Sequence, residues 1–221
     1  MKLIPLPNML RVVFLFFLPL GVIAAALPRL IEGIALERAF PDSALVMTNV
    51  GLPAASYLHL EKTLSSLPAS DGETRILAAE AAVDAGRPPV SVLPAVEDGL
   101  SRAPADARGW ILLASMVKDQ DPQRAAKAFN LAFELAPLDH YLIVPRTALG
   151  AQLWDHLPTG ERHTILSDAR AIATNDNRRD DLRALLGTPA GAALVTKAFE
   201  NDPEGIKKLN RDLTREALHL R

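Results

Sequence analysis

The feature that most constrains this chain is an uncharged, apolar run near its N-terminus. Seventeen consecutive residues at 12–28, VVFLFFLPLGVIAAALP, separate Arg11 from Arg29. At a rise of about 1.5 Å per residue a helix of this length spans roughly 25 Å, slightly less than the hydrocarbon core of a bilayer, which is about 30 Å thick. Tilting or local thinning of the bilayer closes such a difference. The run therefore predicts a single transmembrane helix at 12–28, which Pro19 is expected to bend.

The charges on the two sides of this run predict its orientation. The flank at 1–11 carries Lys2 and Arg11 and no acidic residue. The residues after the run carry bases and acids together: Arg29, Glu32, Glu37, Arg38 and Asp42. Because basic flanks are retained in the cytoplasm, the N-terminus is expected inside and the rest of the chain outside. We therefore expect a single-pass protein of the bacterial cytoplasmic membrane, with most of its chain periplasmic or otherwise extracytoplasmic.

Three other interpretations of the run remain open. It resembles a cleavable signal peptide that ends at Ala24–Ala26, although no polar segment precedes these alanines and apolar sequence continues after Arg29. It is also compatible with a buried helix of a cytosolic protein. Finally, Gly21 together with Ala24–Ala26 forms a small-residue face that suits a structural subunit packing on another membrane helix.

Composition restricts the rest of the chain to helices. Leu and Ala make up about a third of the 221 residues, whereas aromatic residues make up 5%, a balance that favours close-packed helices over sheets. The formal charge of −2 gives no field that would hold nucleic acid, so a nucleic-acid partner is not expected. The chain has no Cys, which excludes disulfides, thiolate metal ligands and cysteine nucleophiles.

Pro and Gly divide the chain after residue 28 into short helices with 3.6-residue spacing. Predicted helices cover 29–40, 43–50, 53–66, 72–85, 89–103, 105–118, 122–136, 145–156, 160–174, 179–186, 189–200 and 203–220. The clearest starts are Asp121-Pro122, Thr188-Pro189 and Asp202-Pro203, because each places a side-chain acceptor at the N-cap and a proline at the first helical position. The mixed charges at 176–181 indicate a solvated linker between helices.

Two neighbouring segments form an internal repeat. In the first, Trp110, Leu113, Ala114 and Val117 occupy one helix, and Ala125, Phe129, Ala132 and Pro137 the next. The segment that contains them resembles a tetratricopeptide repeat, with a turn about one residue short and Val117 in place of the usual aromatic residue. The preceding segment matches more weakly, through Val92, Val96, Gly99 and Pro104, with 72–85 as its first helix. Pro145 interrupts the first helix expected of a further hairpin.

The predicted fold is an all-α, irregular tetratricopeptide-like helical-hairpin solenoid preceded by one transmembrane helix. The expected parts are a cytoplasmic flank (1–11), the transmembrane helix or signal peptide (12–28), membrane-proximal helices (29–70), tetratricopeptide-like repeats (71–174) and a C-terminal helical piece (175–221).

The resemblance implies a protein-interaction surface. In this family the first helix of each repeat lines a groove, and the matching positions here are Arg108, Ile111, Ser115, Lys118 and Asp119. The resemblance thus implies a membrane-anchored, non-enzymatic adaptor or scaffold that binds envelope or membrane proteins. In architecture the chain is similar to accessory proteins of bacterial cell-envelope or exopolysaccharide assembly.

The sequence contains no recognisable catalytic or cofactor motif. The five histidines lack the spacing of a metal-binding pair, and no GxSxG elbow, SxxK motif or phosphate loop occurs. We therefore predict no catalytic, cofactor or metal site. The alternative is an exported helical enzyme or small-ligand-binding protein, which would require a pocket where side chains flanking one turn converge: Asp155, His156, Glu161 and His163.

Overall fold

The computed structural model describes residues 17, 20–24, 26–27, 30, 33–34, 37, 52–67 and 71–219, with side chains up to residue 211 and at residue 213. The helix expected at 43–50 lies outside these residues, as does most of the helices expected at 12–28 and 29–40. The described chain is all-α and contains no strand, which confirms the fold class at this level. Within it, no helix is both long and apolar enough to cross a membrane.

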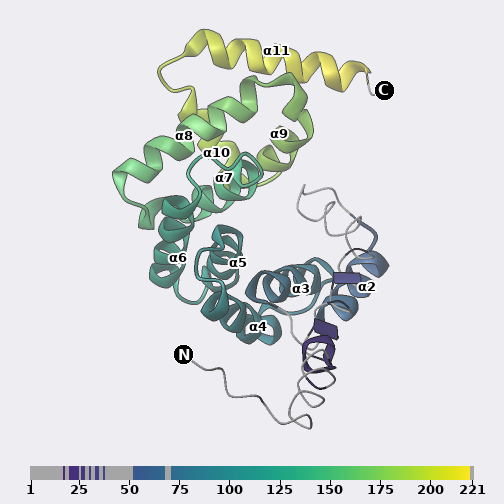
Figure 1. Cartoon of the computed structure of the whole chain (residues 1–221). Helices are drawn as coiled ribbons and strands as arrows, with labels where there is room; N and C mark the ends of the chain where they lie inside the picture. Colours follow the sequence, from purple (N-terminus) through teal and green to yellow (C-terminus); the bar gives the residue numbers. More distant parts are fainter. Residues whose placement is uncertain are drawn as a thin grey trace, which may run out of the picture. The chain divides into compact units, whose positions relative to one another are not determined.

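The helices follow the predicted ranges closely (Figure 1). In chain order the elements are α2 (Ala54–Ser65), α3 (Gly72–Asp84), α4 (Pro89–Arg102), α5 (Ala107–Val117), α6 (Pro122–Leu135), α7 (Ile143–Gln152), the 3-10 turn η1 (Trp154–His156), α8 (Thr159–Thr174), the 3-10 turn η2 (Asp176–Arg178), α9 (Arg179–Leu186), α10 (Pro189–Ala198) and α11 (Pro203–His219).

Side chains placed just before the helices fix where several of them begin. The carboxylate of Asp121 accepts a hydrogen bond from the backbone N–H of Arg124 at 2.9 Å. The hydroxyl of Thr188 and the carboxylate of Asp202 accept from Gly191 and Gly205 in the same way, at 3.1 and 2.9 Å. Each bond satisfies one of the N–H groups that a helix start leaves without an internal partner. All three predicted starts are confirmed.

The predicted helix at 145–156 differs from the structure at both ends. α7 begins at Ile143, two residues before Pro145. Proline is tolerated there because an N–H in the first turn has no acceptor within the helix. At the other end, Leu153 adopts φ −92° and ψ 7°, which ends the α-helix, and the chain continues as the 3-10 turn η1.

The chain forms two compact units, one up to Pro88 and the other from Pro89 onward. The boundary falls between α3 and α4, the two helices that the weaker repeat combines. In the first unit α2 and α3 pack side by side (Figure 1). Their core consists of Leu60, Leu64, Leu67, Leu77, Ala78 and Ala81. An ion pair of 2.9 Å between Arg87 and Glu61 joins the residues after α3 to α2.

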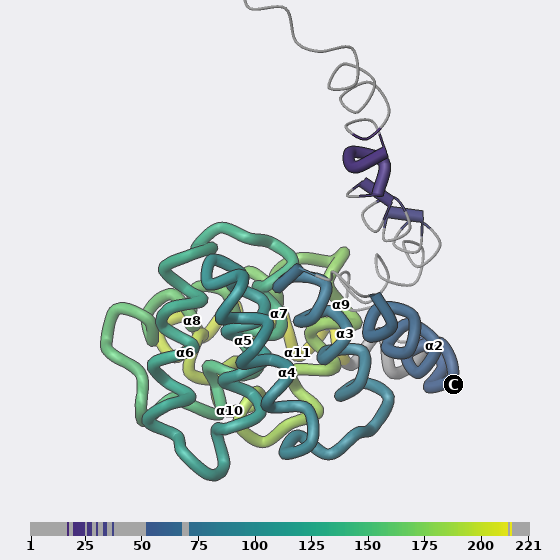
Figure 2. Tube along the Cα trace, turned by 60° about the horizontal axis from the view of Figure 1, so that its bottom comes forward, coloured from purple at the N-terminus to yellow at the C-terminus, as the bar shows by residue number. Residues whose placement is uncertain are grey.

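In the second unit, α5 and α6 form the helical hairpin that the stronger repeat predicted (Figure 2). Small side chains at Ala114, Ala125 and Ala132 are buried, and Phe129 is fully buried. The indole N–H of Trp110 donates to the carbonyl of Pro104 at 2.9 Å, which links the start of α5 to the residues after α4. This packing of successive helices is compatible with a helical-repeat fold.

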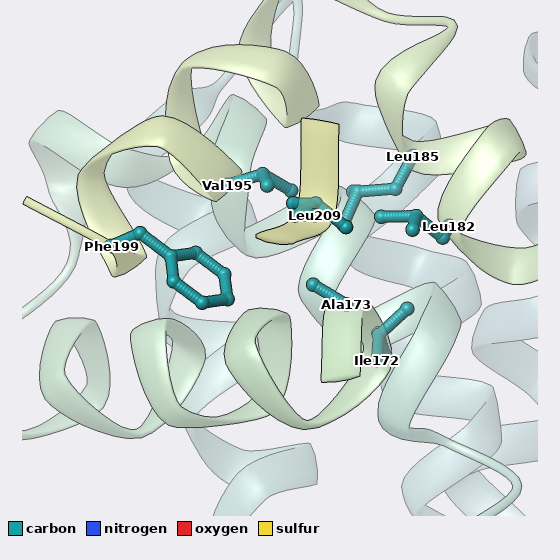
Figure 3. Close-up of a cluster of buried hydrophobic side chains, with 7 residues drawn as sticks. All are labelled: Ile172, Ala173, Leu182, Leu185, Val195, Phe199 and Leu209. Carbon is teal, nitrogen blue, oxygen red and sulfur yellow. The ribbon is translucent and has the colours of Figure 1, made fainter. Parts of the chain in front are cut away.

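The later helices of the second unit share one hydrophobic core (Figure 3). Side chains from α8, α9, α10 and α11 converge in it: Ile172, Ala173, Leu182, Leu185, Val195, Phe199 and Leu209. Ile143, Val144 and Ala148 of α7 pack against the same cluster. The helices after residue 175 are therefore packed on α7 and α8.

Candidate functional site

The five residues expected to line a groove differ in their exposure. Ile111 is buried, with 7% of its surface exposed. Arg108, Ser115 and Lys118 are half-buried, and Asp119 is exposed. The Ser115 hydroxyl donates to the carbonyl of Leu112 at 2.8 Å, and Lys118 pairs with Asp119 at 2.8 Å. Ser115 and Lys118 of the expected groove thus already have partners nearby. The side chain of Ile111 belongs to the interior of the unit.

The four side chains that flank the turn before α8 form no acid–base pair in the structure. Asp155, His156 and His163 are exposed and Glu161 is half-buried, and no hydrogen bond or ion pair joins any two of them in the described part of the chain. No set of three His, Asp or Glu side chains among the described residues lies close enough to hold a metal ion. None of these four side chains is thus joined to another at this turn.

A buried arginine, which the sequence analysis did not single out, organises the second unit. Arg146 of α7 is 2% exposed. Its Nε and Nη2 donate to Oδ2 of Asp168 on α8 at 3.0 and 2.7 Å. Its Nη1 donates to the carbonyls of Ala136 and Pro137 at 3.3 and 3.1 Å. The guanidinium also lies 4.7 Å from the ring centroid of Phe133.

This arrangement joins three helices through one side chain. The carbonyls of Ala136 and Pro137 directly follow α6, where the helix provides no N–H donor for them, and a cation at a helix C-terminus is favourable. Burial raises the pKa of the Asp168 carboxyl above its ordinary value of 3.8, and the Arg146 guanidinium opposes that shift. Both charges are thus occupied by each other and by backbone carbonyls, so the pair is a structural clamp.

Other arginines of the second unit bind backbone carbonyls at the ends of helices in the same way. Arg170 donates from Nη2 to the carbonyl of Ala198 at the end of α10 at 2.8 Å. Arg162 donates from Nε to the carbonyl of Leu157 after η1 at 2.7 Å. Since buried backbone carbonyls need partners, these arginines fix the loops that connect the helices.

The loop at residues 136–141, here called the α6–α7 loop, presents apolar side chains to solvent. Leu138 is 92% exposed and Tyr141 is 51% exposed. The rings of His140 and Tyr141 lie 3.9 Å apart between centroids. Leu135, the last residue of α6, is also 39% exposed. Three large apolar side chains within seven residues are thus exposed, and a group of exposed apolar side chains marks a candidate contact surface.

Apolar side chains are also exposed on the described helical residues near the N-terminus. Phe17, Leu20, Val22, Ile23 and Leu27 are 51–66% exposed. Successive helical residues are about 100° apart around the axis, so Leu20 and Val22 lie on nearly opposite sides. Exposed apolar side chains therefore surround this helical segment instead of forming one core-facing stripe.

Comparison of the chain with models of protein families, with curated proteins and with solved structures found no match.

Proposed function

We propose that this chain is a membrane-anchored, non-enzymatic adaptor. Its apolar N-terminal segment at 12–28 is held in the bacterial cytoplasmic membrane, and its helical body binds envelope proteins outside the cytoplasm. The body is an irregular solenoid of the tetratricopeptide-like type, with α5 and α6 as its best-formed hairpin. A role accessory to cell-envelope or exopolysaccharide assembly fits this architecture.

The observation that carries the proposal is the exposure of apolar side chains on the described helical residues between 17 and 27. Full burial of a large apolar side chain is worth about 1.5–3 kcal/mol, and five such side chains here are more than half exposed. A helix that is apolar on all sides belongs in a protein core or in lipid. Since these side chains are not in the core, lipid is the environment that would cover them.

The adaptor role follows from what the helical body offers. Several of its polar side chains cap helix starts or, like Arg146 and Asp168, join one helix to another. Apolar side chains such as Leu138 are exposed on its surface. A tether confines the body to the membrane surface, which raises its effective concentration near membrane partners and permits weak contacts to be productive.

Fractionation of cells that express the full 221-residue chain tests the anchor. The chain is expected in the membrane pellet after alkaline carbonate extraction, with an intact mass that includes residues 1–28. A matched variant that lacks residues 1–28 is expected in the soluble fraction. Full-length chain in the soluble cytosolic fraction, or a product cut after Ala26, would contradict the anchor.

A further inference from the structure

We infer that the α6–α7 loop is the contact by which the helical body docks on a protein partner, with Leu138 entering an apolar pocket that basic side chains border. This inference deepens the proposed function and rests on it, because an adaptor requires a partner.

Two arginines that lie outside the loop donate hydrogen bonds to its backbone carbonyls. Arg146 donates to the carbonyls of Ala136 and Pro137 at 3.3 and 3.1 Å. Arg178 of η2 donates from Nη2 to the carbonyl of His140 at 3.3 Å. The loop is therefore fixed at both of its ends by side chains from outside it.

A turn within the loop adds a further constraint. Asp139 Oδ1 accepts from the backbone N–H of Tyr141 at 2.9 Å, the arrangement by which aspartate mimics a backbone turn. The neighbouring Leu138 is left 92% exposed. A surface that is ordered before binding loses little conformational entropy on binding, so even one buried leucine can contribute strongly to affinity.

The charges beside Leu138 favour a basic partner. Glu134, one turn before it, is exposed and has no ion pair within the described chain. Asp139 has no ion pair there either. The nearby guanidinium of Arg178 lies 3.5 Å from the carboxylate of Asp181, which offsets its charge. The border of the loop thus carries negative charge, which a pocket lined by Lys or Arg complements.

The same charges decide between a protein and a bilayer surface. A bilayer surface that contains anionic lipids is negatively charged, so Glu134 and Asp139 would be repelled from it. A protein pocket with basic borders has no such penalty. We therefore assign the loop to a protein contact.

Site-specific photocrosslinking in living cells tests this assignment. The photoreactive residue p-benzoylphenylalanine is placed in the full chain at Leu138, at Asp119 in the expected groove of α5, and at the exposed Glu200 as a control. Position 138 is expected to give one discrete protein adduct that positions 119 and 200 do not give. That protein is then identified by mass spectrometry and purified for binding measurements.

Binding between the two purified proteins measures the role of the leucine and of the charge. Leu138→Ala is expected to weaken binding about tenfold, the loss expected for one buried leucine. Glu134→Gln is expected to weaken binding by a smaller factor that vanishes at high salt. Glu200→Gln is the matched control, and circular dichroism verifies that each variant is folded.

The outcomes separate the docking site from the adaptor role. Protein adducts at position 119 alone would overturn the loop assignment. The adaptor role would then be retained, with the α5 surface as the docking site. Lipid adducts at 138, or no adduct at 138, would also overturn the assignment. Absence of protein adducts at every position would contradict the adaptor role itself, and an unchanged affinity of Leu138→Ala would remove the leucine from the contact.

Discussion

The Arg146 side chain shows at the scale of single residues how this fold uses charge. A buried guanidinium is costly unless all its donors are occupied. Here Asp168 and two carbonyls at the end of α6 occupy them. The signal for this clamp lies in the sequence, since Arg146 and Asp168 both fall on the apolar faces of their helices. Which partner each charge meets depends on the crossing of α7 and α8, which one helix alone does not reveal.

The pKa of Asp168 gives this pair a defined pH dependence. Because burial raises the pKa in the folded state, the folded chain binds the proton more tightly than the unfolded chain does. This carboxyl therefore contributes stability that is complete below its ordinary pKa of 3.8 and is lost as the pH rises through the raised pKa. Arg146 limits the loss, because it lowers the pKa toward the ordinary value.

Removal of the guanidinium should therefore be most damaging at neutral pH. We expect Arg146→Met to lower the free energy of unfolding by about 3 kcal/mol or more at pH 7, the cost of breaking one buried ion pair. Near pH 4 the loss should be smaller, because Asp168 can then bind a proton. Urea denaturation at about pH 4 and pH 7 measures both values.

The double variant Arg146→Met with Asp168→Asn is the control for this measurement. For the single variant, the loss of stability relative to the native chain should increase between pH 4 and pH 7. For the double variant, that increase should be absent. A single variant that loses as much stability at pH 4 as at pH 7 would show that Asp168 does not carry the effect.

At the scale of helices, local chemistry predicted most boundaries. Asp121 and Thr188 are N-caps because the side chain of each can accept a hydrogen bond from the backbone N–H three residues later. This property needs no tertiary context. The burial of Ile111 was not predictable in this way. Whether a residue on an apolar helix faces a groove or a neighbouring helix depends on how the next hairpin packs, and the repeat resemblance alone did not supply that.

The crossing of α7 and α8 depends on one glycine. A Cβ atom added at Gly150 would lie 2.7 Å from Cδ1 and 3.0 Å from Cγ1 of Ile165. Ile165 is fully buried, so its side chain has no free space to enter. The glycine therefore permits a close helix approach that no larger residue allows.

Gly150→Ala should consequently destabilise the chain, although alanine favours helices. We expect the free energy of unfolding to fall by about 1–3 kcal/mol, the usual cost of overpacking a core. Gly160→Ala in α8 is the matched control, because its Cβ would meet nothing within 4 Å; it should be neutral or gain up to about 1 kcal/mol.

Denaturant unfolding of both variants tests this account of the crossing. Adding Ile165→Val to Gly150→Ala should recover part of the lost stability, because it shortens the side chain in contact. Equal stability of Gly150→Ala and Gly160→Ala would mean that α7 and α8 do not approach at Gly150.

At the scale of the whole molecule, the chain combines an apolar N-terminal segment with a helical body whose polar side chains largely serve its own structure. Arginine side chains bind carbonyls at helix ends, and aspartate side chains cap helix starts. The exposed apolar side chains include Leu138 with its neighbours and the described helical residues between 17 and 27. From this division we propose that the N-terminal segment lies in a membrane and that the body contacts other proteins.

The most direct test of this account uses the absence of cysteine from the native chain. Single cysteines are introduced as Lys2→Cys, before the apolar run, and as Glu200→Cys, on the exposed surface of the body. Spheroplasts are then treated with a membrane-impermeant maleimide before and after lysis. The account predicts that Glu200→Cys is labelled equally in intact and lysed spheroplasts, whereas Lys2→Cys is labelled only after lysis. Labelling of Glu200→Cys only after lysis would contradict it, because the body would then lie inside the cell.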